Sequence, residues 1–107
     1  MKRVGFLLKV KREMLEEYKK HHEAVWPEML AALSQHGWHN YSLFLRPDGT
    51  IFGYLETPDS FQAALEGMGT EQVNTRWQEF MSPFVDSLAG EHPDKIMLEL
   101  EEVFHLD

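Results

Sequence analysis

The tripeptide Pro47-Asp48-Gly49 is the feature that most constrains the fold of this chain. Proline presets the backbone for a turn, aspartate bonds to its own backbone, and glycine accepts a positive φ. The runs on either side, 38–46 (WHNYSLFLR) and 50–56 (TIFGYLE), have the composition and alternation typical of strands. The tripeptide therefore predicts a β-hairpin. In its first strand, alternate positions should share one face, and these are His39, Tyr41, Leu43 and Leu45.

Each end of the chain is expected to supply a further strand. Residues 3–10 (RVGFLLKV) alternate, with Val4, Phe6, Leu8 and Val10 on one face. Residues 96–104 (IMLELEEVF) alternate in the same way, after a predicted loop over 88–95.

Helical spacing fills the stretch between the first strand and the hairpin. It begins at about Glu13, and Pro27 divides it because a proline disfavours helical geometry at the preceding residue, Trp26. Pro27 also suits the first turn of a second helix, PEMLAALSQH, which Gly37 is expected to end.

Helical spacing returns after the hairpin. Thr57-Pro58-Asp59 is expected to open a helix that runs to about Leu65. Gly67 and Gly69 should interrupt it, and Thr70 should cap a second helix that reaches Phe84.

The order of elements is then β-α-β-β-α-β, which predicts an α+β fold of the ferredoxin-like type, a sandwich of helices on one antiparallel sheet. The length of 107 residues fits a single domain over residues 1–107. Helices would cover one sheet face and leave the other open. That open face favours a homodimer.

Composition excludes several classes of function. The formal net charge is -8, so a nucleic-acid backbone would be repelled, and we expect no nucleic-acid partner. The chain contains no cysteine, which removes disulfides, thiolate nucleophiles and zinc–thiolate sites. No apolar run approaches the roughly 18 residues of a membrane span, and no signal-peptide core is evident. We therefore expect a cytoplasmic protein without a membrane partner.

The residues Tyr18, His22 and Trp26 lie four apart and would share one helical face. A histidine titrates near neutral pH, so this stripe could form the wall of a sugar-sized pocket with one proton-transfer group. Stripes of this kind also occur as ordinary packing faces. Spacing alone leaves both interpretations open.

Two further residues have two interpretations each. Tyr41 could be buried or could present its hydroxyl to a ligand, and Trp77 could pack in the core or against a sugar face. A metal site made from His22, His36 and His39 is conceivable, but the spacing fits no familiar metal motif. We predict no metal.

Several segments taken together resemble the L-rhamnose mutarotase family. They are EEYKKHHEAVWPEM (16–29), HGWHNYSLFL (36–45), TRWQEFM (75–81) and ELEEVFHL (99–106). The resemblance implies a dimeric α+β barrel that interconverts the α and β anomers of L-rhamnopyranose without a cofactor or metal. It also implies that His22 is the proton donor and that Tyr18, Tyr41 and Trp77 contact the sugar. The family has a second tryptophan where this chain has Gln78, so sugar preference is open.

Two other functions are compatible with such a fold. One is a cofactor-free monooxygenase, which would need a more apolar pocket for an aromatic substrate. The other is a non-catalytic, sugar-binding dimer, which would bind L-rhamnose without accelerating anomer exchange.

Overall fold

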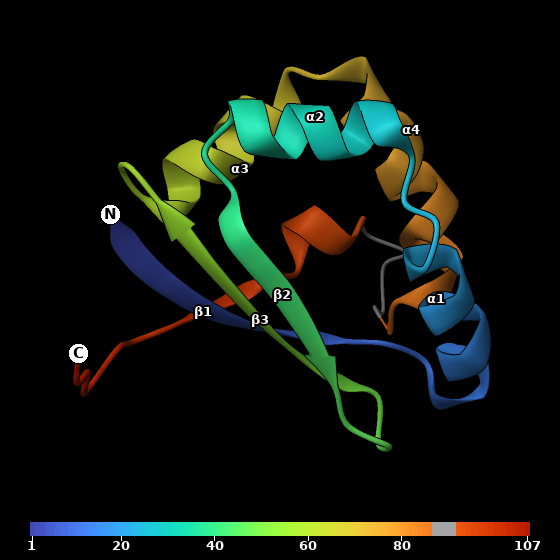
Figure 1. Ribbon diagram of the computed structural model, residues 1–107. Coiled ribbons are helices and arrows are strands. Elements are labelled where there is room, and N and C mark those ends of the chain that lie inside the picture. The colour runs from blue at the N-terminus through green and yellow to red at the C-terminus, as the bar shows by residue number, and fades with distance from the viewer. Residues whose placement is uncertain (87–91) are drawn as a thin grey trace.

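The computed structural model describes residues 1–86 and 92–107. Four strands form one antiparallel sheet in the order β2-β3-β1-β4 (Figure 1). Their bounds are β1 Lys2–Lys9, β2 His39–Leu45, β3 Thr50–Thr57 and β4 Leu98–Leu100. The predicted α+β class with an antiparallel sheet is confirmed.

The hairpin forms where the sequence predicts it. The Thr50 backbone N–H donates to Asp48 Oδ1 at 3.0 Å, and the Arg46 N–H donates to the Thr50 carbonyl oxygen at 2.8 Å. Gly49 adopts a φ of +96°, where an added Cβ would overlap the carbonyl oxygen of Val10. Glycine is therefore required at this turn.

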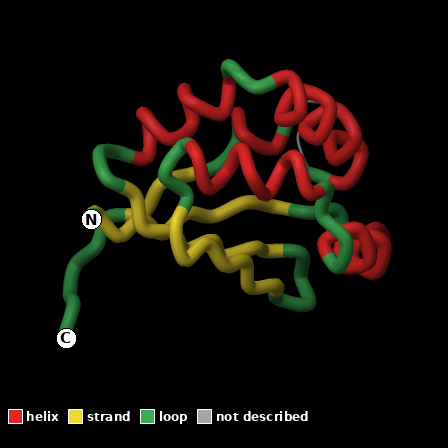
Figure 2. The backbone as a smooth tube through the Cα atoms, turned by 45° about the horizontal axis from the view of Figure 1, so that its top comes forward, coloured by secondary structure: helices red, strands yellow, loops and turns green. Residues whose placement is uncertain are grey.

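Three helices lie over one face of the sheet, and a fourth lies beside the end of β1 (Figures 1 and 2). The three are α2 Pro27–Gln35, α3 Phe61–Gly69 and α4 Gln72–Met81; the fourth is α1 Leu15–His22. Single 3₁₀ turns occupy Arg12–Met14, Ser82–Phe84 and Pro93–Lys95. As predicted, Pro27 begins α2 and Trp26 is extended, with ψ at 134°.

The region after the hairpin differs from the prediction. Ser60 caps α3, accepting a hydrogen bond from the Ala63 N–H at 3.0 Å. The helix then continues through Gly67, where a Cβ would lie 2.6 Å from His36 Nδ1, so this glycine permits close packing and does not end the helix. Thr70 caps the C-terminus of α3, and the residue before α4 is Glu71. The predicted Thr70 cap of α4 is wrong.

The last strand is also shorter than predicted. Of the predicted strand over 96–104, only Leu98–Leu100 pair with β1. Residues 101–107 are exposed and have no regular structure. The predicted strand over 96–104 is wrong at both ends, because an alternating pattern does not fix how much of a segment finds a pairing partner. Of the predicted loop over 88–95, residues 88–91 lie outside the described residues, and Pro93–Lys95 form a 3₁₀ turn.

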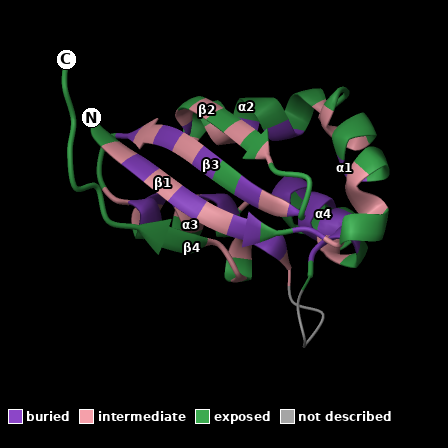
Figure 3. Cartoon of the chain, turned by 90° about the horizontal axis from the view of Figure 1, so that it is seen from below, coloured by how far each residue is buried: buried purple, intermediate pink, exposed green. Residues whose placement is uncertain are grey.

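The core lies between the sheet and the helices. Phe6 is fully buried and stacks on Phe61, with ring centroids 5.4 Å apart. The opposite sheet face, seen from below in Figure 3, is not covered by α1, α2, α3 or α4. Its exposed apolar residues are Phe44, Phe52, Leu98 and Leu100. Within residues 1–86 and 92–107, no helix is long and apolar enough to cross a membrane.

Candidate active site

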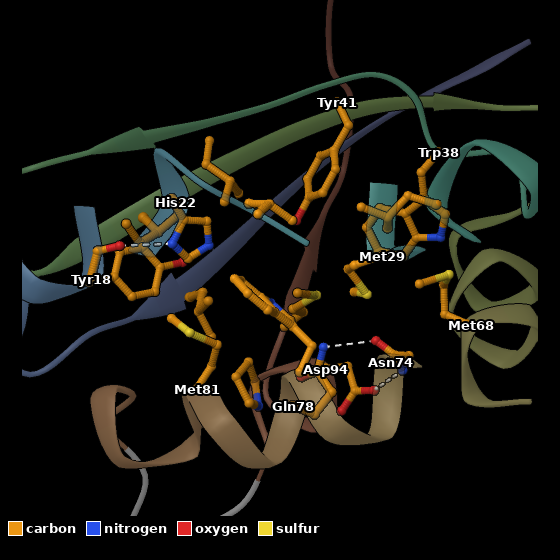
Figure 4. A pocket seen from close by; sticks show the side chains of 18 of the residues that line it. Tyr18, His22, Met29, Trp38, Tyr41, Met68, Asn74, Gln78, Met81 and Asp94 are labelled. Atoms are coloured by element: carbon orange, nitrogen blue, oxygen red, sulfur yellow. Dashed lines mark hydrogen bonds between the residues drawn. The ribbon is translucent and has the colours of Figure 1, made fainter. Parts of the chain in front are cut away.

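A cavity of about 510 Å³ lies between the sheet and the helices (Figure 4). Its wall is largely aliphatic and aromatic, with a few polar groups at separate points. The sheet, α1, α2, α3, α4 and the Pro93–Lys95 turn all contribute side chains to it. A mostly apolar cavity with a few polar groups is the usual form of a small-molecule site.

Tyr18 and His22 form one polar edge of the cavity. They are four residues apart on α1, and their rings lie 4.2 Å apart between centroids. His22 Nδ1 lies 2.9 Å from the Tyr18 carbonyl oxygen, which can only accept a hydrogen bond, so Nδ1 carries a proton. In neutral His22 the other nitrogen, Nε2, therefore has a free lone pair. Figure 4 shows this nitrogen on the side of the ring that faces the cavity.

Burial sets the protonation states at this edge. The low-dielectric surroundings lower the pKa of His22, the hydrogen bond to Tyr18 opposes that change, and the charge of neighbouring His21 adds to it. Burial also raises the pKa of Tyr18 above its ordinary value. At neutral pH, Tyr18 is thus a neutral phenol that can donate a hydrogen bond, and His22 is mainly a neutral imidazole.

Tyr41 enters the cavity from β2, and its hydroxyl points inward (Figure 4). Its ring packs against Trp38 and Phe6, at centroid distances of 4.9 and 6.4 Å. Burial is the main cause that raises the pKa of Tyr41, and the nearby Tyr18 raises it further. This phenol is therefore also a neutral donor.

Trp77 supplies an aromatic wall, and Trp26 supports it from behind. Trp77 lines the cavity and meets the His22 ring edge-on at 5.6 Å. Trp26 packs edge-on against Trp77 at 4.9 Å and is not part of the cavity wall. Tyr18 and His22 therefore line the cavity, whereas Trp26 packs against Trp77 outside it.

The cavity wall also contains a polar group of which the sequence analysis named only Gln78. Asn74 and Gln78 on α4, together with Asp94, hydrogen-bond to one another and line the wall opposite Tyr41 (Figure 4). The positions of Asn74 and Gln78, four apart, were a usable helical signal. Asp94 had no local signal, because it lies in a segment predicted to be a loop.

The three histidines considered for a metal site do not come together. His36 Nε2 lies 2.7 Å from Glu71 Oε2 at the end of α3, whereas His22 lines the cavity. His39 pairs with Glu56 at a register shift of β2, and it does not line the cavity with Tyr41 as the predicted shared face implied. Within the described chain, no three His, Cys, Asp or Glu residues lie close enough to hold a metal ion.

A family model described as L-rhamnose mutarotase matches residues 3–106. The L-rhamnose mutarotase of Oceanobacillus iheyensis is 39% identical over 108 residues, covering 100% of both chains. That of Bacillus subtilis is 38% identical, also over 108 residues and 100% of both chains. The chain belongs to the L-rhamnose mutarotase family. The resemblance inferred from the sequence is therefore confirmed.

A solved structure agrees with the fold of this L-rhamnose mutarotase family member. The crystal structure of L-rhamnose mutarotase from Formosa agariphila matches with a TM-score of 0.84 at 23% identity, covering 100% of both chains. In the chain described here, the four predicted site residues line one cavity: Tyr18, His22, Tyr41 and Trp77.

Proposed function

We propose that this protein is an L-rhamnose mutarotase, an isomerase that interconverts the α and β anomers of L-rhamnopyranose by opening and reclosing the ring. The observation that carries the proposal is the His22 imidazole, which lines the cavity with its proton held on Nδ1 by the Tyr18 carbonyl. Family membership supports L-rhamnose as the sugar.

The proposed reaction moves one proton between two oxygens of the same carbon. His22 Nε2 removes the proton from the anomeric hydroxyl, the bond between C1 and the ring oxygen breaks, and the imidazolium protonates that oxygen. The product is the open-chain aldehyde. After rotation about C1–C2, the same steps run in reverse on the other carbonyl face. His22 is thus both base and proton donor, a role that typically contributes about 10²–10⁴-fold to a rate.

The remaining site residues position the sugar. Tyr18 and Tyr41, as neutral phenols, donate hydrogen bonds to sugar oxygens. Trp77 packs against an apolar C–H face of the pyranose, an arrangement suited to an indole ring. The thioethers of Met29 and Met68 line the cavity and accommodate the methyl group of a 6-deoxy sugar. Because proton transfer leaves no net redox change, this reaction consumes no cofactor.

The proposal includes a single ferredoxin-like domain over residues 1–107 that forms a homodimeric α+β barrel. The strand order β2-β3-β1-β4 supports the topology. The exposed apolar side chains of the open sheet face support the dimer, because an isolated chain would leave them in water: Phe44, Phe52, Leu98 and Leu100.

Saturation-transfer NMR on L-rhamnose tests the function directly. Irradiating one anomeric proton should reduce the signal of the other anomer in the presence of the protein, and by more than in buffer alone. Parallel measurements on L-fucose and other aldoses define the sugar preference. Binding of L-rhamnose without faster exchange would instead support a non-catalytic sugar-binding protein.

A further inference from the structure

Strand β2 contains a bulge beside the cavity. Ser42 and the next three residues pair with β3 in regular register, but His39 lies opposite Glu56, where regular pairing would place Asn40. Between these two points β2 therefore has one residue more than β3. The extra residue comes directly before Tyr41.

Asn40 supplies the backbone conformation of this bulge. Its φ is +48°, and within residues 1–86 and 92–107 no other residue apart from glycine has a positive φ. This left-handed conformation is costly for most side chains and is tolerated best by glycine and asparagine. The Asn40 side chain also donates to Glu56 Oε1 at 2.9 Å, a contact that ties the bulge to β3.

The bulge determines which aromatic ring reaches the cavity. In a regular strand, His39 and Tyr41 would share one face and Trp38 would point to the other. The extra residue reverses this alternation, so that Trp38 lines the cavity with Tyr41 and His39 does not (Figure 4). Bulges next to active sites often redirect a side chain in this way.

Trp38 is held firmly in this position. It is 6% exposed, its indole N–H donates to the Ala64 carbonyl oxygen at 3.1 Å, and its ring meets Phe61 edge-on at 5.8 Å. It also meets the Tyr41 ring edge-on at 4.9 Å. A fixed indole therefore limits the movement of the ring whose hydroxyl points into the cavity.

We propose that Asn40 is a positioning residue of the sugar site: its bulge sets Trp38 against Tyr41 and so holds the Tyr41 hydroxyl where it donates to the sugar. Asn40 itself is exposed and does not line the cavity, so it acts only through these two rings. This inference rests on the proposed mutarotase function, in which Tyr41 binds the substrate.

Two substitutions at Asn40 separate its backbone conformation from its side-chain chemistry. Valine is β-branched and disfavours a positive φ, so Asn40→Val should remove the bulge and turn Trp38 away from Tyr41. Glycine accepts a positive φ but lacks the amide, so Asn40→Gly should keep the bulge. We expect Asn40→Val to weaken L-rhamnose binding by about 3- to 10-fold, the value of one hydrogen bond between neutral groups, with kcat changed by less than about 3-fold. Asn40→Gly should restore binding to the wild-type affinity.

Ser42→Val is the matched control. Ser42 is exposed on the same strand, but it pairs in regular register, where valine is favoured. This variant should bind L-rhamnose like the wild-type protein.

A double-mutant cycle tests whether Asn40 acts through Tyr41. Tyr41→Phe removes the hydroxyl that the bulge positions, so adding Asn40→Val to it should cause no further loss of affinity. NMR titration with L-rhamnose gives the dissociation constants without requiring anomer exchange. The near-UV circular dichroism spectrum reports on packed aromatic rings, and it should change in Asn40→Val and be retained in Asn40→Gly.

The contrary results are distinct. Additive losses in the cycle, equal losses in Asn40→Gly and Asn40→Val, or wild-type affinity in Asn40→Val would overturn the proposal. If Asn40→Val does not fold, Asn40→Ala takes its place in every comparison, because alanine also disfavours the left-handed conformation. Binding of L-rhamnose without anomer exchange would refute the mutarotase function alone and leave this test in force.

Discussion

His22 Nδ1 lies 2.9 Å from the carbonyl oxygen of Tyr18, one helical turn earlier on α1. This contact fixes the tautomer of the neutral imidazole, with the proton on Nδ1 and the lone pair on Nε2. A main-chain carbonyl cannot rotate away or change its protonation, so the orientation is part of the helix itself. The group proposed to carry the reaction is therefore held ready by the backbone.

Replacing His22 by alanine should slow anomer exchange about 10²–10⁴-fold, because the proton-transfer group is lost while the cavity remains. Saturation-transfer NMR on L-rhamnose measures the rate. The neighbouring His21 packs edge-on against Phe80, at 4.8 Å between ring centroids, and does not line the cavity. His21→Gln should therefore keep wild-type exchange. Undiminished exchange in folded His22→Ala would remove His22 from the mechanism.

The reaction should be lost on the acid side of the His22 titration. Burial lowers the pKa of His22 below 6.5, and only the neutral imidazole can accept the first proton. Activity should thus be flat from pH 8 to about 6.5 and fall as pH passes through the lower, folded-state pKa. A pH profile of kcat/KM measures this.

The same shift affects stability. In the unfolded chain, His22 binds its second ring proton at a higher pH than it does in the folded chain. The buried, neutral imidazole therefore makes its full contribution to the free energy of unfolding above about pH 6.5, and that contribution is lost as pH falls through the folded-state pKa. Denaturant titrations at several pH values measure this contribution in the wild-type protein and in His22→Gln, which lacks the titrating group.

The activity profile has its own contrary outcome. A rate of anomer exchange that rises as pH falls below 6.5 would contradict a neutral catalytic imidazole.

Tyr41→Phe should weaken sugar binding by about 3- to 10-fold, the value of one hydrogen bond between neutral groups. Its raised pKa keeps the phenol protonated, so hydrogen-bond donation is what the substitution removes. Tyr54→Phe is the matched control, since the Tyr54 hydroxyl donates to Glu56 at 2.8 Å and lies outside the cavity. Initial rates by polarimetry give KM for each variant, and equal effects of the two substitutions would argue against a sugar contact at Tyr41.

Gly53→Ala should destabilise the fold by about 1–3 kcal/mol. Gly53 lies opposite Phe6 in the sheet, and its Cβ would overlap the Phe6 ring, which is held by stacking on Phe61. A Cβ at Gly69, near the end of α3, meets no atom within 4 Å, so Gly69→Ala should be neutral or stabilising by up to about 1 kcal/mol. Denaturant unfolding measures both. Similar values for the two variants would show that the Phe6 ring moves aside easily.

Charging the open sheet face should disrupt the proposed homodimer. Phe44 and Phe52 pack together at 6.2 Å between centroids and are 59% and 40% exposed. Phe44→Lys would bury two unpaired cations in a symmetric interface, so sedimentation velocity should give half the wild-type mass. Gln72→Lys, on the helical side, should leave the mass unchanged. A monomeric wild-type protein would refute the dimer.

Local signals in the sequence were sufficient for the hairpin and the first helices. Pro47-Asp48-Gly49 and Pro27 act through their own backbone restrictions, which neighbouring elements cannot override. Gly67 shows the opposite case. Glycine usually weakens a helix, but here the Cβ-free position receives His36, and only tertiary packing reveals that.

The candidate site shows the same division. Tyr18 and His22 are related by helical spacing, and Trp77 is aromatic, so sequence patterns identify them as candidates. Asp94 becomes part of the site only because the Pro93–Lys95 turn lies against α4. No pattern within the chain predicts that contact, since its partners are 16 and 20 residues away.

The cavity is bounded by residues that also form the hydrophobic core, among them Leu8, Ile51 and Met81. Larger side chains at these positions would fill the void and tighten the fold, because unfilled space costs packing energy. They would also exclude the sugar. Laboratory selection for heat resistance alone would therefore favour variants that are more stable but inactive. Substitutions that raise stability and preserve activity should occur at the surface, away from the space that the substrate occupies.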